Sequence, residues 1–382
     1  MRSLALDYRP ALYSRGGIAR SVRELARAMT RIANARGLML HLFGHGLKRG
    51  YVAGEPVPAP LHRMRLPGRA LPALALLGLD AARLAGDADL FHWTDYVYPP
   101  VRRGKERPRV VQTVHDLAFM ADARFHGKLG SRRLRKRIAR ALARADLLVC
   151  PSEATARDVQ RYFPDHPPLR VVPFGVDHVE RFRSDPERGR RLAAERLRTS
   201  APYLIALATL EPRKNHCALI EALCILEERG RSVPLLCVGG RGWENEQLFA
   251  RLSSSELPFP CAFTGCIEDA EMFDLLAGAM ALVYPSSLEG FGFPPMEALE
   301  LGVPAIVGDC AAIREQLGDA GLYVNGSDPA SIASGIDGLL AEPDSSEQHL
   351  RAWHARRARF RWQRSAESHL EIYESLIGGG GT

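Results

Sequence analysis

Short apolar segments alternate with amphipathic segments along most of the chain. In the first half, five segments have the length and composition of buried strands: residues 3–8, 38–44, 89–93, 110–116 and 146–152. Behind the first of them, a turn at Gly16 and Gly17 precedes apolar residues at the spacing of one helix face: Ile18, Val22, Leu25, Met29 and Ile32. Strands that alternate with helices in this way predict a parallel sheet with helices on both faces.

A second series of strand-like segments begins near residue 202. Its members are residues 203–210, 234–240, 261–265, 281–286, 304–309 and 321–325. Amphipathic helices are predicted between them, at 215–229 and 270–279. The second half of the chain therefore predicts another sheet of the same kind.

The stretch between the two series, residues 171–191, is more polar and contains Pro173 and Gly175. We place the domain boundary there and expect an N-terminal domain at 1–176 and a C-terminal domain at 177–359. A helix at about 360–377 is expected to pack back on the first domain. The predicted fold class is α/β, with two Rossmann-like domains that face each other across a cleft. Ligands of open parallel sheets bind beyond the carboxyl ends of the strands, so functional residues should follow strands.

Composition and charge narrow the function classes. With 46% hydrophobic and 25% charged residues the chain is globular, and no apolar run reaches the ~20 residues of a membrane span. The first residues lack the features of a secretion signal, so a cytoplasmic location is expected. The net charge of +7 suits an anionic partner, such as a nucleotide diphosphate, a phospholipid or nucleic acid, without choosing among them. The seven scattered cysteines lack metal-type spacing and are expected to be reduced thiols.

The segment 285–304 carries the sharpest signal for a binding site. A strand ends at Ser286, a glycine-rich turn follows, and Pro294 and Pro295 begin a helix. Backbone N–H groups of the turn, Gly292 and the positive end of the helix together predict a site for a diphosphate.

Two carboxylates, Glu289 and Glu297, flank this turn. A carboxylate repels a phosphate, so these two more plausibly accept hydrogen bonds from sugar hydroxyls. Acidic capping of the helix start is the alternative account of Glu297.

Two adjacent cations, Arg213 and Lys214, follow the strand predicted at 203–210. They are placed to neutralise a diphosphate and to stabilise it as it leaves, which requires no metal ion. The alternative is a solvated helix start, but cations there oppose the helix dipole, which favours a phosphate partner.

The stretch from Glu289 to Glu297, with GFGFPPM between them, resembles the E-x7-E segment of family 4 retaining glycosyltransferases, which have the GT-B fold. Six further segments are similar to that family's pattern and occur in its order: RGGIARSV (15–22), TVHDLAF (113–119), VVPFGVD (171–177), ATLEPRKN (208–215), VGGRGW (238–243) and FTGCIED (263–269). The resemblance implies that the N-terminal domain binds the acceptor and the C-terminal domain the nucleotide-sugar. It assigns the donor sugar to Glu289 and the ribose to Glu297.

The resemblance also suggests further site residues. His115 matches an active-site histidine near the donor sugar and acceptor, with Asp116 as an orienting neighbour, although a lone histidine is often structural. Gly16 and Gly17 would let backbone approach the donor phosphate or acceptor, or form a plain turn. The remaining nucleotide-sugar candidates are Thr209, Ile267, Gly290, Phe291, Gly292 and Phe293. Thr209 stands where many relatives carry an arginine, and burial is an equally good account of Ile267.

Two other motifs are interpreted as decoys. Asp87-Ala88-Asp89 has the form of a metal site in the other major glycosyltransferase fold, but it precedes a strand and would lie at the wrong end. GHGLKRG (44–50) nearly matches a dinucleotide fingerprint, but its spacing is wrong and no apolar helix follows.

The resemblance implies a retaining, metal-independent transferase without a cofactor, by a front-face route or through a covalent intermediate. The segments TLEPRKN and GGRGW are similar to those of bacterial mannosyl-type transferases that build surface polysaccharide such as lipopolysaccharide. GDP-mannose is therefore the expected donor, a glycan or lipid-linked molecule is the expected acceptor, and no nucleic-acid partner is expected. The alternatives are a nucleotide-sugar epimerase or phosphorylase on the same fold, or a non-catalytic basic protein that binds membranes or polyanions.

Residues 128–144 predict a basic amphipathic helix. Its apolar stripe consists of Leu134, Ile138, Ala141, Leu142 and the following Ala145. The remaining face carries Arg132, Arg133, Arg135, Lys136, Arg137, Arg140 and Arg144, with no acidic residue before Asp146. We expect Arg133, Arg137 and Arg140 to contact an anionic membrane or a phosphate-bearing acceptor, at the inner face of the cytoplasmic membrane. A solvated helix that serves solubility is the alternative.

Overall fold

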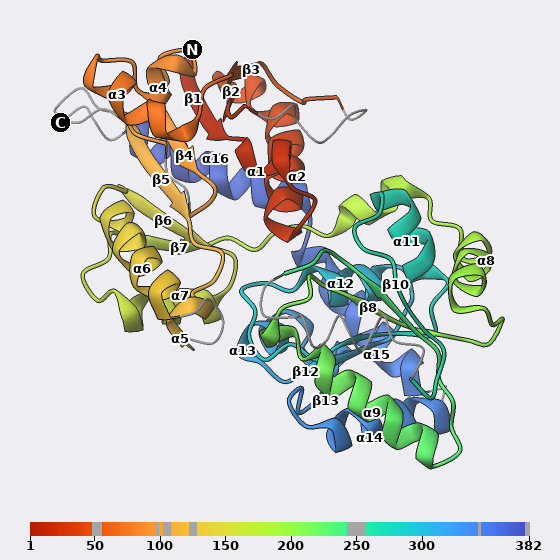
Figure 1. The fold of residues 1–382 in the computed structure, drawn as a ribbon. Coiled ribbons are helices and arrows are strands. Elements are labelled where there is room, and N and C mark those ends of the chain that lie inside the picture. Colours follow the sequence, from red (N-terminus) through yellow and green to blue (C-terminus); the bar gives the residue numbers. More distant parts are fainter. Residues whose placement is uncertain are drawn as a thin grey trace. The chain divides into compact units, whose positions relative to one another are not determined.

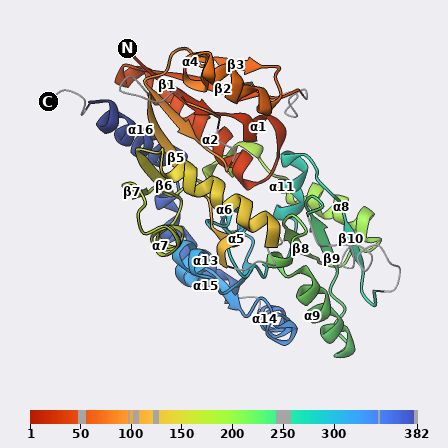
Figure 2. The ribbon, with the colours of Figure 1, turned by 60° about the vertical axis from the view of Figure 1, so that its left-hand side comes forward.

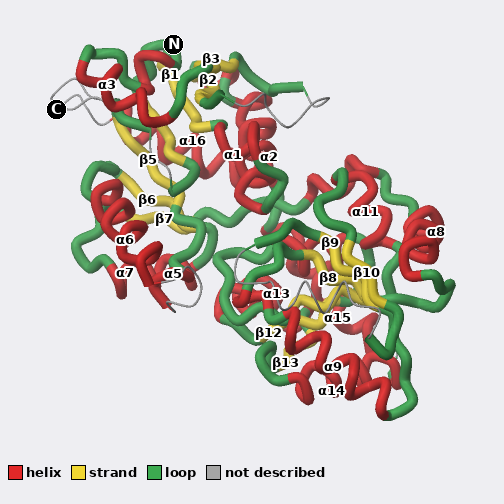
Figure 3. Tube along the Cα trace, viewed as in Figure 1, coloured by secondary structure: helices red, strands yellow, loops and turns green. Residues whose placement is uncertain are grey.

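The computed structural model describes residues 1–47, 56–96, 99–101, 108–121, 128–242, 257–342 and 345–378. The chain forms two compact units, the first made of Met1–Gly175 and the segment from Phe360 onward, the second of Val176–Arg359 (Figure 1). Each unit has a single parallel sheet with helices on both faces, as the colouring by secondary structure shows (Figure 3). The predicted α/β fold class is confirmed.

The first unit has seven parallel strands in the order β3-β2-β1-β4-β5-β6-β7. The strands are β1 (Arg2–Asp7), β2 (Leu38–His45), β3 (Leu61–Met64), β4 (Leu90–Trp93), β5 (Arg109–Thr113), β6 (Leu147–Cys150) and β7 (Leu169–Val171). The sequence analysis missed β3 and β7. Both lie at sheet edges and are short and only partly buried, so they lack the apolar run that marks the central strands.

The helices of the first unit cover both faces of its sheet. They are α1 (Arg9–Tyr13), α2 (Gly17–Ile32), α3 (Leu71–Leu76), α4 (Ala81–Leu84), α5 (Ala118–Ala121), α6 (Lys128–Leu142), α7 (Glu153–Tyr162) and α16 (Trp362–Gly378). Helices α2 and α16 pack together, and α16 runs against β5 (Figure 2). Apolar residues of α3, α4 and α6 join Phe43, Phe91 and Trp93 in one core cluster, which belongs to the opposite face.

The second unit has six parallel strands in the order β10-β9-β8-β11-β12-β13. They are β8 (Leu204–Leu207), β9 (Leu235–Val238), β10 (Cys261–Phe263), β11 (Ala281–Tyr284), β12 (Ala305–Gly308) and β13 (Leu322–Val324). The helices are α8 (Pro186–Leu197), α9 (His216–Glu228), α11 (Asp269–Ala277), α12 (Phe293–Glu300), α13 (Ala311–Leu317), α14 (Pro329–Ala341) and α15 (Ser345–Arg356). Helices α9 and α14 pack together on one face, and α8 packs with α11.

Several smaller expectations can be compared with the structure. Asp89 exchanges two hydrogen bonds with the backbone of Ser3 at the amino end of β4, so the D-x-D sequence ties two strand starts together. The second decoy begins in β2, and its residues 48–50 lie outside the described part. All seven cysteines are free. Within the described part of the chain, no helix is long and apolar enough to cross a membrane.

A buried polar cluster fastens α16 to the first sheet. The two ring nitrogens of His92 on β4 bond to Tyr373 Oη (2.6 Å) and Thr113 Oγ1 (2.8 Å). His369 stacks on His92 with ring centroids 5.7 Å apart and bonds through Nδ1 to the carbonyl of Ser365. Burial lowers the pKa of His369 to about 4 and lowers that of His92 well below its ordinary value. Both imidazoles are therefore neutral in the folded protein at pH 7.

This cluster predicts that acid loosens α16. A histidine whose folded pKa is depressed opposes protonation, so stability is lost as the pH falls from the unfolded value of 6.5 toward about 4. Limited proteolysis near the C-terminus should become faster between pH 7 and pH 5. His369→Phe should show a smaller acid effect than wild type, and an unchanged pH dependence would contradict this account.

Candidate functional site

Two loops meet at the carboxyl edge of the second sheet. One follows β8 and contains a 3-10 turn, Pro212–Lys214, and the other follows β11. Asn215 Nδ2 donates to the carbonyl of Pro285 (2.8 Å) and to Ser287 Oγ (2.7 Å), while Ser287 N donates to the carbonyl of Arg213 (2.9 Å). These bonds hold the predicted cations beside the glycine-rich turn.

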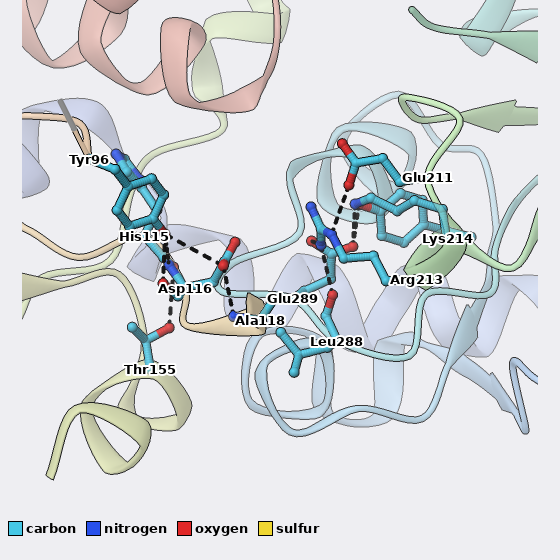
Figure 4. Close-up of polar contacts among 11 residues, drawn as sticks. Tyr96, His115, Asp116, Ala118, Thr155, Glu211, Arg213, Lys214, Leu288 and Glu289 are labelled. Atoms are coloured by element: carbon cyan, nitrogen blue, oxygen red, sulfur yellow. Dashed lines mark hydrogen bonds and ion pairs between the residues drawn. The ribbon is translucent and has the colours of Figure 1, made fainter. Parts of the chain in front are cut away.

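Glu289 joins the two cations in one polar cluster (Figure 4). Its Oε1 forms an ion pair with Lys214 Nζ, and its Oε2 accepts a hydrogen bond from Arg213 Nη1 at 3.2 Å. Arg213 also donates to the carbonyl of Leu288 (2.8 Å) and to Glu211 Oε2 (3.0 Å). The structure thus brings together three of the four residues predicted to be catalytic.

Tyr284, at the end of β11, completes this cluster and was not predicted. Its hydroxyl accepts from Lys214 Nζ (2.7 Å) and donates to Glu289 Oε1 (2.8 Å). The Lys214 ammonium also lies 4.8 Å from the centre of the Tyr284 ring. The residue looked like an ordinary buried strand residue, because its apolar neighbours gave no signal for the hydroxyl.

The charges of the cluster balance. Burial alone would raise the pKa of Glu289, but Lys214 and Arg213 outweigh it and lower the pKa to about 2. Burial and Arg213 lower the pKa of Lys214, while Glu289 acts in the opposite direction. The formal charges of Arg213 and Lys214 are matched by those of Glu289 and Glu211. An anionic ligand at this site would therefore have to share these cations with a carboxylate or displace it.

Glu297 lies in a different environment from Glu289. It is fully buried on α12, and its Oε1 accepts a hydrogen bond from His178 Nε2 at 2.9 Å. The rings of Phe273 and Phe293 lie 6.0 and 6.1 Å from that of His178. The sequence analysis missed His178, although it directly follows VVPFGVD. The ribose role of Glu297 stays a prediction.

The glycine-rich turn needs Gly292 in particular. Gly292 has a φ of +85° and precedes α12, and a Cβ there would lie 2.2 Å from Ile313 Cδ1. Phe291 and Phe293 are buried with ring centroids 5.0 Å apart, while Gly290 is also buried. Phe291 and Phe293 therefore belong to the buried packing around the turn, and their contact with a nucleotide-sugar stays a prediction.

Thr209 and Ile267 are half-buried and follow β8 and β10. The neighbouring loop after β9 approaches closely, because a Cβ on Gly239 would lie 1.9 Å from the carbonyl oxygen of Ala208. Gly239 N donates to the carbonyl of Gly265 at 3.1 Å, which links this loop to the one after β10. Both predicted residues therefore lie on the same sheet edge as the Lys214 cluster.

His115 lies at the carboxyl edge of the first sheet, just beyond β5. Its Nε2 donates to the carbonyl of Thr94 at 2.8 Å, and its own carbonyl accepts from Thr155 Oγ1 at 3.3 Å (Figure 4). Burial lowers the pKa of His115, while the Thr94 bond acts in the opposite direction. In the neutral form, a proton on Nε2 leaves Nδ1 as a hydrogen-bond acceptor.

The hydrogen bonds of Asp116 position the start of α5 and the Tyr96 side chain. Its Oδ1 accepts from Ala118 N at 3.0 Å, at the start of α5. Its backbone carbonyl and N–H both bond to Tyr96 Oη, at 2.6 and 3.0 Å. The Thr94 carbonyl, rather than the neighbouring aspartate, sets the tautomer of His115.

Gly16 and Gly17 begin α2 after the additional short helix α1. Gly16 has an extended backbone with φ of −67°, and a Cβ there would meet only Ser14 Oγ, at 3.6 Å. Neither backbone strain nor crowding within this unit therefore explains why residue 16 is a glycine. Its predicted contact with donor or acceptor stays a prediction.

The basic helix forms as α6, with Ile138, Ala141 and Leu142 buried and Arg140 exposed. The side chains of Arg133, Leu134 and Arg137 lie outside the described part. Among the described residues, no group of three or more histidine, cysteine or acidic side chains is arranged to hold a metal ion.

Two family models match the chain. Glycosyltransferase Family 4 matches residues 15–180, and glycosyl transferases group 1 matches residues 189–355. The O-antigen chain mannosyltransferase B of Escherichia coli is 27% identical over 291 residues, which cover 74% of this chain and 75% of that protein. The D-inositol 3-phosphate glycosyltransferase of Salinispora arenicola is 30% identical in an alignment that covers 83% of this chain and 75% of that protein.

Among solved structures, Anabaena HepE in complex with UDP-glucose superposes with a TM-score of 0.74 at 18% identity, covering 98% of this chain and 100% of HepE. The two parallel-sheet units and these matches define a glycosyltransferase of the GT-B fold. The chain belongs to glycosyltransferase family 4.

Proposed function

We propose that this chain is a retaining, metal-independent glycosyltransferase that moves mannose from GDP-mannose to a glycan or lipid-linked acceptor in the synthesis of a surface polysaccharide. The observation that carries the proposal is the buried cluster of Arg213, Lys214 and Glu289 at the carboxyl edge of a parallel sheet in a family 4 chain. The likeness to the O-antigen chain mannosyltransferase supports mannose and the class of polymer.

The reaction breaks the bond between the anomeric carbon and the diphosphate oxygen. Negative charge grows on the leaving diphosphate, where Lys214 and Arg213 would supply positive charge without a metal ion. The acceptor hydroxyl then bonds to the anomeric carbon on the same face and gives its proton to the departing phosphate oxygen. A covalent glycosyl-enzyme intermediate would give the same stereochemistry.

Glu289 has a second role in this proposal. In the structure it forms ion pairs with both cations, so a bound diphosphate would compete with it for them. The carboxylate would then accept hydrogen bonds from the hydroxyls of the donor sugar, which are uncharged donors. Glu297 would hold the ribose, and Gly290 to Phe293 and Thr209 would line the nucleotide-sugar site, with Ile267 against the base.

His115 would contribute from the first unit, together with the backbone at Gly16 and Gly17. Its Nδ1 can accept a hydrogen bond from a sugar hydroxyl while Nε2 stays on the Thr94 carbonyl. We further propose that the cations of α6, Arg133, Arg137 and Arg140 among them, bind the enzyme peripherally to the inner face of the cytoplasmic membrane. Each such residue near an anionic leaflet contributes about 1 kcal/mol.

The test of this function is a donor screen followed by a transfer assay in excess EDTA. GDP-mannose should raise the melting temperature more than UDP-, ADP- and dTDP-sugars do. At 100 times its Kd, GDP-mannose should stabilise the folded protein by about 2.7 kcal/mol. Mannose should then pass to an oligosaccharide acceptor in the presence of EDTA. NMR of the product should show that the anomeric configuration of the donor is retained.

Each alternative has its own outcome in this experiment. Conversion of the donor without an acceptor would indicate an epimerase, and turnover that requires inorganic phosphate would indicate a phosphorylase. Loss of activity in EDTA that Mg²⁺ or Mn²⁺ restores would contradict metal independence. Salt-sensitive binding to any polyanion, without preference for a nucleotide, would indicate a non-catalytic binding protein.

A further inference from the structure

Three exposed leucines cluster at the end of α3 and in its connection to α4. Leu76, Leu77 and Leu79 are 89%, 77% and 40% exposed, and only Gly78 interrupts them. We call residues 76–79 the leucine turn. A contiguous group of exposed leucines is a candidate surface for contact with a membrane or another protein.

The leucine turn is ordered, and most of the surface of Leu76 and Leu77 lies outside the core. Leu79 N donates to the carbonyl of Leu74 (2.9 Å) and Gly78 N to that of Ala75 (3.1 Å), with Gly78 at a φ of +78°. This is the hydrogen-bond pattern of a helix end closed by a left-handed glycine. The inward-facing Leu71 and Leu74 already fill the core beneath it. The exposed leucines therefore project from a firm support.

One cation is held against the leucine turn. Arg83 Nη1 donates to the carbonyl of Gly78 at 3.4 Å, which holds a guanidinium against the turn. The adjacent Asp80 is fully buried, where its carboxylate caps α4 by accepting from Ala82 N and Arg83 N. Its negative charge is thus engaged with the helix start and withdrawn from the surface.

The basic helix α6 shares this face of the sheet. Ala141 of α6 and Leu71 of α3 belong to the same core cluster, so the outer sides of both helices face away from the same side of the sheet. The described, exposed cations of α6 are Arg132, Arg135, Lys136 and Arg140. Exposed leucines on the same face as arginines and lysines match the two layers of an anionic bilayer, its acyl region and its headgroups.

We propose that the leucine turn inserts Leu76, Leu77 and Leu79 into the acyl region of an anionic membrane while Arg83 and the cations of α6 contact the headgroups. This inference rests on the membrane contact proposed above for α6 and adds an apolar anchor to it. Electrostatic attraction falls steeply with salt, whereas apolar insertion does not. The two contributions are therefore separable by ionic strength.

The first experiment measures co-sedimentation of the full chain with phosphatidylglycerol-containing vesicles at low and high salt. Leu76→Gln/Leu77→Gln should bind at least about tenfold more weakly at high salt, because the removed side chains supply the apolar transfer energy. Leu47→Gln is the matched control, since Leu47 is 69% exposed but follows the carboxyl end of β2, whereas the leucine turn leads into the amino end of β4. Equal high-salt binding of wild type and the double variant would overturn the proposal.

A second experiment detects insertion directly. Leu77→Trp should be quenched by lipids brominated on the acyl chains, beyond the quenching of the wild-type tryptophans, and Leu47→Trp should not. Membrane binding without quenching of Leu77→Trp would overturn the proposal, as would a lipid-free wild-type dimer that Leu76→Gln/Leu77→Gln converts to monomer. Transfer to a water-soluble acceptor should be the same in wild type and the double variant, so failure of the glycosyltransferase function is seen separately.

Discussion

A Lys214→Met protein should turn over about 10²–10³-fold more slowly than wild type at saturating donor, as when one preorganised donor is deleted from an anion site. Lys214 Nζ is buried between Glu289 and Tyr284, so its charge acts in a site with little water to screen it. The diphosphate gains negative charge as the sugar bond breaks, and the ammonium stabilises that gain. Methionine keeps most of the side-chain volume and removes the ammonium with its charge and hydrogen bonds, so kcat measures the polar contribution of that group.

The matched control is Arg314→Met in the same unit. Arg314 forms an exposed ion pair with Asp309, both side chains being about half exposed, so its loss should leave kcat near the wild-type value. A folded Lys214→Met protein with nearly wild-type turnover would remove Lys214 from the mechanism.

The same variant has a readout without substrate. Glu289 has a pKa of about 2 against an ordinary 4.5, so it contributes stability that is present above pH 4.5 and lost as the pH falls toward 2. Without the Lys214 charge the pKa of Glu289 should rise, and unfolding should depend less on pH across that window.

The two glutamates should respond oppositely to loss of charge. Glu289→Gln should lower kcat by about 10²–10³-fold, because an amide is a weaker acceptor for the sugar hydroxyls, while nucleoside diphosphate binding persists or tightens. Tightening is expected because Glu289 forms ion pairs with both Lys214 and Arg213, and without its charge only Glu211 competes with the diphosphate for these cations. Titration calorimetry with GDP, alongside kcat, measures the two effects.

Glu297→Gln should instead weaken the nucleotide, by about tenfold, the value of one charge-assisted hydrogen bond. Glutamine is preferred to alanine here, because its Oε1 can still accept the hydrogen bond from His178 Nε2, whereas alanine would remove that acceptor and destabilise the fold. Loss of GDP binding in Glu289→Gln together with unchanged binding in Glu297→Gln would reverse the assigned roles.

The central strands were predictable because each is buried on both faces of its sheet and therefore needs a continuous run of apolar residues. The loops after β8 and β11 were predictable as site loops for a related reason: in a parallel sheet, residues that follow central strands gather at one edge. Arg213, Lys214 and Glu289 meet there through chain segments about 75 residues apart. The edge strands β3 and β7 escaped prediction, because an edge strand needs no continuous apolar run.

The partners of the site residues were not predictable in the same way. His178 and Glu297 are 119 residues apart, and the strand pattern gave Tyr284 no role beyond packing. The paired state of Lys214 was also missed, since the sequence suggested free cations awaiting a phosphate. A polar contact depends on side-chain direction and separation in space, and neither is recorded in the periodicity of a segment.

The sequence by itself determined the α/β class, the two series of strands and the loops that carry the candidate chemistry. These features follow from local alternation of apolar and polar residues, which each segment carries independently of its neighbours. Tertiary structure alone decided that Glu289 is held by two cations and a tyrosine, that Glu297 is closed in with His178, and that Leu76 and Leu77 remain outside the core. An apolar or charged side chain acquires its role only when packing sets which surfaces are covered and which groups share a buried, weakly screened space.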